Sequence, residues 1–179
     1  MIFDKNFRDI LVSQWISVLV GFIVGTLVAI YVDKVILIPG MLILLPGFLE
    51  MRGNISGSLA SRISSGLFLK VIKPGRFNGR IIRGNLMASF LLVILVSFFL
   101  GIVVFLFNLV LLKVYMPRMI FIPLIAGILA NFIETPLTIF ATFYLFKKGH
   151  DPNNIMGPFI TSTGDITSII ALIITIIII

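Results

Sequence analysis

The chain has 179 residues, of which 59% are hydrophobic and only 12% are charged, and it carries a formal net charge of +7. Because a soluble domain carries about a quarter charged residues, this composition excludes a soluble globular protein and predicts an integral membrane protein. Cysteine is absent and histidine occurs once, which excludes a disulfide framework, a cysteine nucleophile and a zinc site built from several histidines of one chain.

Five apolar segments reach the length of a membrane span. They follow an N-terminal segment, residues 1–10, and cover residues 11–32, 35–69, 86–112, 119–146 and 155–179. We therefore predict an all-α, polytopic membrane protein with five transmembrane helices, which together form one domain over residues 11–179.

The second segment is longer than the ~20 residues that one crossing needs, and Pro39, Gly40, Pro46 and Gly47 interrupt it. We expect a short broken piece over residues 35–45 and a helix over residues 46–69. That helix carries many polar side chains, namely Glu50, Arg52, Asn54, Ser56, Ser58, Ser61, Arg62, Ser64 and Ser65. It cannot face lipid all round, so it packs inside a bundle or lines water, and we expect it to pair with a second copy of the chain.

Lysine and arginine residues are distributed unevenly between the spans. With a cytoplasmic N-terminus, nine of them lie inside (Lys5, Arg8, Lys70, Lys73, Arg76, Arg80, Arg83, Lys147 and Lys148) and three outside (Lys34, Lys113 and Arg118). Because cytoplasmic loops are enriched in basic residues, we predict a cell-membrane protein with its N-terminus cytoplasmic and its C-terminus outside. The positive charge is then a topology signal, and we expect no nucleic-acid partner.

Three carboxylates, Glu50, Glu134 and Asp165, lie near the middle of predicted spans. An ionisable group at that depth costs ~3 kcal/mol or more, so each is a candidate functional residue. The alternative role of Glu50 is to neutralise Arg52, two residues away. Glu134 precedes Pro136, which removes a helix hydrogen bond and leaves a kinked, polar patch in an apolar span.

Asp165 follows a stretch rich in hydroxyl groups, and no basic residue lies within helical reach on its own span. Such a carboxylate needs a cation from elsewhere, and a metal ion that enters from water would serve. The alternative is a protonated aspartic acid that is hydrogen-bonded to Thr161 or Ser162. The available ligands are all hard oxygen atoms, which suit Mg²⁺, Ca²⁺, Mn²⁺ or Na⁺ and not copper.

Two motifs resemble those of a known family. Residues 53–64 read Gly-Asn-Ile-Ser-Gly-Ser-Leu-Ala-Ser-Arg-Ile-Ser, which resembles the second-helix motif of the MgtE-like divalent cation transporters. The pattern of GN followed by LASR is nearer to the animal solute-carrier branch than to the bacterial GNxGNQ form. Asp151-Pro152, Gly157-Pro158 and Gly164-Asp165 are similar to the DP…P…GD signature that enters the family's last helix. The resemblance extends over about residues 11–179.

This resemblance implies an ion pathway at a dimer interface, lined by the second and fifth helices of both copies. It also implies that Asp165 coordinates the ion and that Asn54 lines the pathway. The chain departs from the bacterial motif at Gly57-Ser58, where the bacterial form has Asn-Gln, so those two amide ligands are missing.

We therefore expect a homodimeric transporter or channel for a divalent cation, Mg²⁺ above all, that needs no cofactor besides the ion it carries. Candidate metal-site residues are Asp165, Asn54, Glu50, Glu134, Asn131, Ser58 and Thr161. The alternatives are a Na⁺- or H⁺-coupled exchanger of the divalent ion and a non-transporting membrane scaffold. An enzyme is not expected, because the chain has no HExxH motif and its single histidine, His150, lies at the end of the fourth span.

Overall fold

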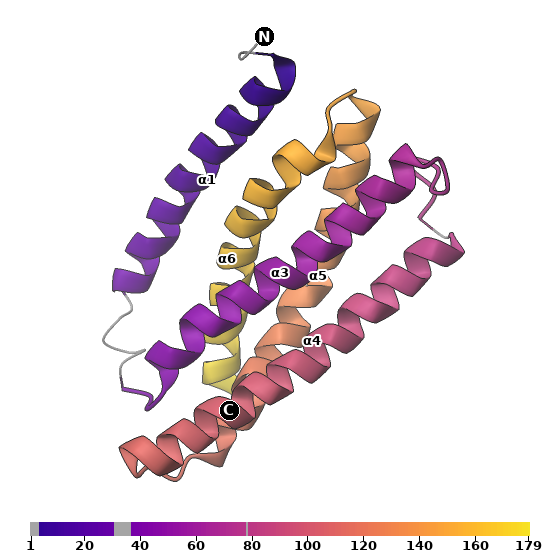
Figure 1. Cartoon of the computed structure of the whole chain (residues 1–179). Helices are drawn as coiled ribbons and strands as arrows, with labels where there is room; N and C mark the ends of the chain where they lie inside the picture. Colours follow the sequence, from indigo (N-terminus) through magenta and orange to yellow (C-terminus); the bar gives the residue numbers. More distant parts are fainter. Residues whose placement is uncertain (1–3, 31–36, 78) are drawn as a thin grey trace.

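The structure is a computed structural model that describes residues 4–30, 37–77 and 79–179. Regular structure within these ranges is entirely helical, which confirms the predicted all-α class. The long helices are α1 (Lys5–Ile30), α3 (Met41–Phe68), α4 (Arg80–Phe107), α5 (Phe121–Lys147) and α6 (Pro152–Ile178) (Figure 1). A π-helical turn, η1 (Asn108–Leu112), and a 3₁₀ turn, η2 (Pro117–Ile120), connect α4 to α5.

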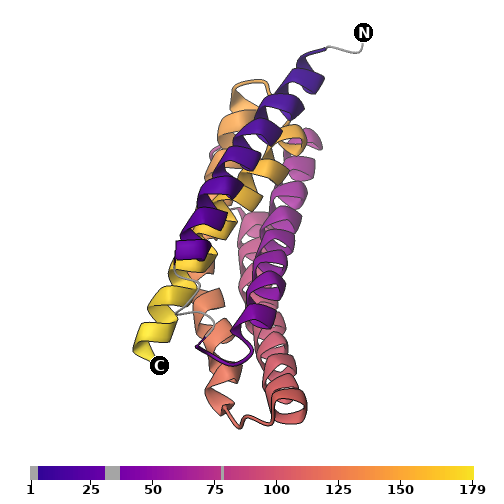
Figure 2. The same cartoon turned by 90° about the vertical axis from the view of Figure 1, so that its left-hand side faces the viewer.

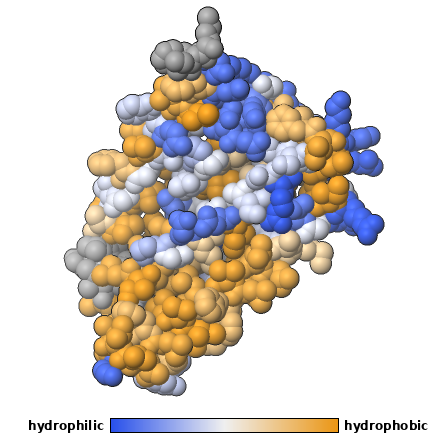
Figure 3. Space-filling view, viewed as in Figure 1, coloured by the Kyte–Doolittle hydropathy of each residue, from blue (hydrophilic) through white to orange (hydrophobic). Residues whose placement is uncertain are grey.

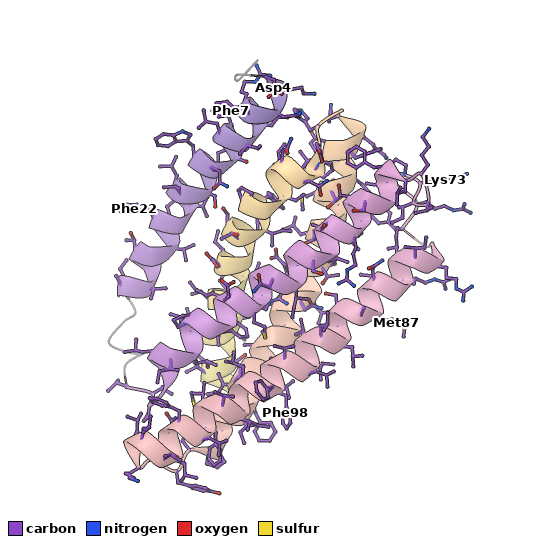
Figure 4. The ribbon with its side chains drawn as sticks, in the orientation of Figure 1. Asp4, Phe7, Phe22, Lys73, Met87 and Phe98 are labelled. Carbon is purple, nitrogen blue, oxygen red and sulfur yellow. The ribbon has the colours of Figure 1, made fainter. Side chains whose placement is uncertain are left out.

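In the described residues, four of these helical stretches are long and apolar enough to cross a membrane: α1, α4 with η1, η2 with α5, and α6. The remaining long helix is α3, whose 28 residues are sufficient in length but include several polar and charged side chains. Phe22, Met87 and Phe98 are exposed on α1 and α4, as expected for side chains that face lipid (Figure 4). A multi-pass membrane protein is thus confirmed, while the count of five spans depends on α3.

The start of α3 differs from the prediction. Residues 37–40 form a turn, and the helix then runs without interruption from Met41 through Pro46 to Phe68. The break expected at Pro46 is not observed, because one proline removes a single backbone hydrogen bond from a helix that is packed along its length. The turn itself is held by Asn108, whose Nδ2 donates to the Pro39 carbonyl at 2.8 Å. Residues 35 and 36 of the expected broken piece lie outside the described residues.

Helices α3, α4, α5 and α6 pack into a bundle, and α1 lies along α6 at its edge (Figure 2). Helices α3 and α5 contact each other, and each also contacts α4 and α6, so this pair forms the centre of the bundle. Apolar side chains from these helices form the core, including Phe48 of α3, Val93 of α4, Ala130 of α5 and Leu172 of α6. The polar side chains discussed below therefore lie between or beside well-packed apolar layers.

Most of the basic residues in the described part of the chain gather at one end of the bundle. The start of α1 and the α5–α6 connection meet there, because the Lys5 ammonium donates to the Gly149 carbonyl at 2.7 Å and His150 Nδ1 lies 2.7 Å from Asp9 Oδ2. The α3–α4 connection, with Lys73, lies at the same end (Figures 1 and 4). Lys113 and Arg118 lie at the opposite end, between α4 and α5. This grouping matches the prediction for the described residues, and Lys34 lies outside them.

Candidate functional site

One face of α3 is polar and exposed. Glu50, Asn54, Ser58 and Arg62 follow one another at intervals of four residues and are exposed, whereas Met51, Ile55, Leu59 and Ile63 are buried. Residues four apart on a helix share a face. Figure 3 shows blue and pale residues across the middle of this side of the molecule, over α3, with apolar residues below them. Lipid cannot satisfy such a face, so it adjoins water or another protein surface.

A cavity of about 530 Å³ lies where this face meets α6. Its lining residues within the described ranges come from these two helices: Pro46, Leu49, Glu50, Gly53, Asn54 and Gly57 from α3, and Gly157, Ile160, Thr161, Gly164 and Asp165 from α6. Four of them are glycines. A Cβ added to Gly53, Gly57 or Gly157 would meet no other atom within 4 Å, so the missing side chains at these positions keep the cavity open.

Two carboxylates line this cavity from different helices, Glu50 from α3 and Asp165 from α6. Glu50 Oε1 accepts a hydrogen bond from Asn54 Nδ2 at 3.0 Å. Asp165 is half-buried, and its carboxylate has no hydrogen bond or ion pair to any residue in the described ranges. A half-buried carboxylate without a protein partner is available to a cation or to the water around it.

The alternative hydrogen bonds considered for Asp165 are not formed. The Thr161 hydroxyl donates to the Gly157 carbonyl at 3.1 Å, and the Ser162 hydroxyl donates to the Pro158 carbonyl at 2.9 Å. Both hydroxyls therefore bond to the backbone of their own helix. The alternative role of Glu50 is also wrong, because Arg52 points into the bundle and Glu50 points out of it. Residues two apart on a helix point about 200° away from each other, so adjacency in sequence does not bring these two side chains together.

The other predicted residues lie elsewhere. Ser58 is exposed on α3 one turn beyond Asn54, where its Oγ accepts from Arg62 Nη2 at 3.1 Å. Asn131 and Glu134 of α5 are buried in the bundle, 0% and 1% exposed, and do not line the cavity. The structure thus brings together Asp165, Glu50, Asn54 and Thr161, and separates Asn131 and Glu134 from them.

Sequence reasoning missed the internal contacts of Asn131 and Glu134. Asn131 Oδ1 accepts from Arg52 Nη1 at 3.0 Å, and Glu134 accepts hydrogen bonds from Thr163 and Thr167 of α6. The threonines lie two residues before and after Asp165, a spacing that is visible in the sequence but that carries no signal without knowledge of which helix face is buried.

In the described residues, no group of three or more acidic or histidine side chains converges on one point. One chain therefore supplies two carboxylates to the cavity, fewer than a fully dehydrated divalent ion needs. A second hollow, of about 400 Å³, lies at the α3–α4 connection and is lined by Lys70, Lys73, Arg76 and Arg80, so its charge repels cations. The cavity between α3 and α6 is the candidate cation site.

Comparison with known proteins identifies one family. The sequence model of MgtE, described as a divalent cation transporter, matches residues 45–175, which include nearly all of α3 and the whole of α4 and α5, and most of α6. The match does not distinguish a branch of the family, so the nearer likeness to the animal branch stays a prediction. No curated protein and no solved structure matches the chain.

Proposed function

Because the chain belongs to the MgtE family of divalent cation transporters, we propose that it carries hydrated Mg²⁺ along the cavity between α3 and α6, at the interface of a homodimer. Divalent cation transport follows from the family, and this is a family of transporters and not of enzymes. The ion, the pathway and the dimer are the proposal.

The main support for this proposal is the position of Asp165. Its carboxylate faces an open cavity between membrane helices and has no protein partner in the described ranges. Glu50 adds a second negative charge to the same cavity. Two carboxylates that share a confined site repel each other, and a divalent cation relieves that repulsion. Among the residues that the structure describes, no basic side chain lines the cavity, so an ion from solution is the available counter-charge.

The size of the cavity favours an ion that keeps its water. Mg²⁺ holds six oxygen ligands and dehydrates reluctantly. Six water molecules at ~30 Å³ each take up roughly 180 Å³, and the cavity of about 530 Å³ has room for them. Asn54 and Thr161 present an amide and a hydroxyl to the same space, where they can hydrogen-bond to the outer side of a water shell.

A second copy of the chain completes the site. The polar face of α3 is exposed along its length, and hydrocarbon is a costly environment for Glu50 and Arg62. Pairing about a two-fold axis beside α3 and α6 covers this face with its own equivalent and turns one open cavity into a pathway shared by both copies. Four carboxylates, Glu50 and Asp165 of each copy, then surround the ion. We propose in addition that the basic end of the bundle is cytoplasmic.

The test is Mg²⁺ uptake into proteoliposomes. Asp165→Asn should abolish uptake, because it removes the charge and leaves the shape of the side chain. The control is Asp4→Asn, the same chemical change at the exposed start of the chain, which should transport like the wild type. Wild-type uptake by Asp165→Asn, in protein that is folded and dimeric, would refute the proposal.

Neither of the two alternative functions, a coupled exchanger and a non-transporting membrane scaffold, is supported. Membership of a transporter family argues against a non-transporting scaffold, and no contact in the described residues favours coupling to Na⁺ or H⁺. Uptake that continues without an opposing Na⁺ or proton gradient would exclude obligatory coupled exchange.

A further inference from the structure

The interior of the bundle contains two opposite charges that the proposed ion pathway does not use. Arg52 of α3 and Glu134 of α5 are each 1% exposed, and Arg52 has the largest residue volume among the fully buried side chains of the described residues. Burying either charge alone is strongly unfavourable, so a buried charge in a membrane bundle requires compensation and usually has a role.

Glu134 connects α5 to α6 through both of its oxygens. Its Oε1 accepts from the Thr163 hydroxyl at 3.1 Å, and its Oε2 accepts from the Thr167 hydroxyl at 3.0 Å. Each hydroxyl shares its single hydrogen with a carbonyl of α6, Phe159 at 2.9 Å from Thr163 and Gly164 at 3.1 Å from Thr167. Between these contacts the carboxylate lies against the backbone at Gly164, where an added Cβ would be 3.7 Å from Oε1. The carboxylate therefore spans one turn of α6.

That turn is the one that carries Asp165. Thr163 and Thr167 are four residues apart and share a helix face, whereas Asp165 lies midway between them and about 200° around the helix from each. The face with the threonines contacts α5, and the face with Asp165 lines the cavity. Glu134 thus contacts the side of this helical turn that is opposite to Asp165, the proposed ion ligand.

Arg52 connects α3 to the same region of α5. Its Nη1 donates to Asn131 Oδ1 at 3.0 Å, and that oxygen also accepts from the Thr135 hydroxyl at 2.9 Å. Asn131 precedes Glu134 by three residues, which places both on one side of α5. Arg52 and Glu134 form no direct ion pair in the described residues, but their opposite charges attract each other across the interior, and Glu134 is also near enough to Asp165 for their negative charges to repel.

We propose that Glu134, with its charge balanced by Arg52, is a positioning residue that fixes the turn of α6 bearing Asp165, and is not itself a ligand of the transported ion. This inference rests on the proposed function, in which Asp165 is the ion ligand. Glu134 is 1% exposed, does not line the cavity and accepts a threonine hydroxyl at each of its oxygens, so it is out of reach of a passing ion.

The first experiment removes the two threonine contacts and leaves every charge in place. The double variant Thr163→Val/Thr167→Val keeps the side-chain shape, and Thr163→Ser/Thr167→Ser keeps the hydroxyls. The matched control is Thr175→Val, because the Thr175 hydroxyl is also buried on α6 but bonds only to the Ala171 carbonyl of its own helix.

We expect the valine pair to raise the half-saturating Mg²⁺ concentration about tenfold, which corresponds to ~1.4 kcal/mol of binding free energy. The serine pair and Thr175→Val should match the wild type. A purely structural role would lower the amount of folded protein without moving the half-saturating concentration. Wild-type half-saturation in the valine pair would therefore overturn the inference.

The second experiment removes the charges singly and together. Arg52→Met and Glu134→Gln each leave one buried charge without compensation, so each should reduce uptake severely, whereas Arg52→Met/Glu134→Gln should recover a substantial part of it. If Glu134 is an ion ligand, the double variant will be as inactive as Glu134→Gln, and the inference is overturned. If a single-charge variant does not fold, the threonine variants decide.

Asp165→Asn, measured in the same assay, separates this inference from the proposed function. Wild-type uptake by Asp165→Asn removes the proposed function and this inference with it. Loss of uptake in Asp165→Asn, together with wild-type half-saturation in the valine pair, leaves the proposed function intact and refutes only the role of Glu134.

Discussion

Asp165 of α6 and Glu50 of α3 line the same cavity, although their helices are the last and the second of the long helices in the chain. Their negative charges repel each other in a space that no lysine or arginine side chain of the described ranges lines. The protein tolerates this repulsion in the part of the fold where charge is costly, which is understandable if a cation is bound there.

Divalent cations should stabilise the folded protein in detergent. A ligand that binds only the folded state at 100 times its dissociation constant adds about 2.7 kcal/mol to the free energy of unfolding. We expect Mg²⁺ to raise the thermal midpoint of the wild type and to leave that of Asp165→Asn unchanged, in a titration at constant ionic strength. An equal shift in both proteins would mean that the ion binds elsewhere.

A large side chain at Gly157 should block transport without unfolding the protein. A Cβ at Gly157 would meet no atom within 4 Å, and the position lines the cavity, so Gly157→Phe places its ring in the proposed pathway. The control is Gly84→Phe on α4, another exposed position where a Cβ would meet nothing and which is not among the cavity-lining residues.

Uptake of Mg²⁺ and the oligomeric state are measured for both glycine variants. Gly157→Phe should lose most of its uptake and Gly84→Phe should keep it. If Gly157→Phe transports normally as a dimer, the ion does not pass through this cavity.

Gly101 of α4 should be required for stability. The backbone of Ile120 approaches it so closely that a Cβ would collide with the Ile120 carbonyl. Because backbone atoms cannot move aside cheaply, Gly101→Ala should lower the free energy of unfolding by about 1–3 kcal/mol. Gly84→Ala, on the same helix and in open space, should be neutral or slightly stabilising. Denaturation in detergent compares the two variants, and equal stabilities would contradict the close approach of α4 and η2.

The orientation of the bundle can be tested with single cysteines, because the chain contains none. Arg76→Cys lies at the basic end, in the α3–α4 connection, and Lys113→Cys lies at the opposite end, and both positions are exposed. In intact cells an impermeant maleimide should label Lys113→Cys and should label Arg76→Cys only after the membrane is opened. The reverse pattern would invert the proposed topology.

The different environments of Asp165 and Glu134 could not be predicted from the sequence. Both are single carboxylates in apolar spans, and both were predicted to be metal-site residues on the same grounds. The structure places one at a cavity and the other on two threonine hydroxyls inside the bundle. In a membrane helix the side that faces other helices is also apolar, so hydropathy does not reveal which side of α5 is buried.

The contacts of Arg52 and Glu50, which lie on one helix, could not be predicted from the sequence either. Their adjacency in the sequence suggested mutual neutralisation, but the helical rotation of about 200° between them directs Arg52 to Asn131 and Glu50 to the cavity. The start of α3 also differs from the prediction. Pro39-Gly40 and Pro46-Gly47 both favour a break in the sequence, but only Pro39 and Gly40 lie in a turn, and Pro46 lies within the helix.

The sequence by itself determined the membrane environment, the helical class, the clustering of basic residues at one end and the family. These depend on composition, on the length of apolar runs and on residue order, and none of them requires a knowledge of packing. Only the tertiary structure decided which polar side chains meet. Each helix can rotate about its axis without changing its hydropathy, and the contacts of α5 with α3 and α6 select the rotation that turns Glu134 inward and leaves Asp165 at the cavity.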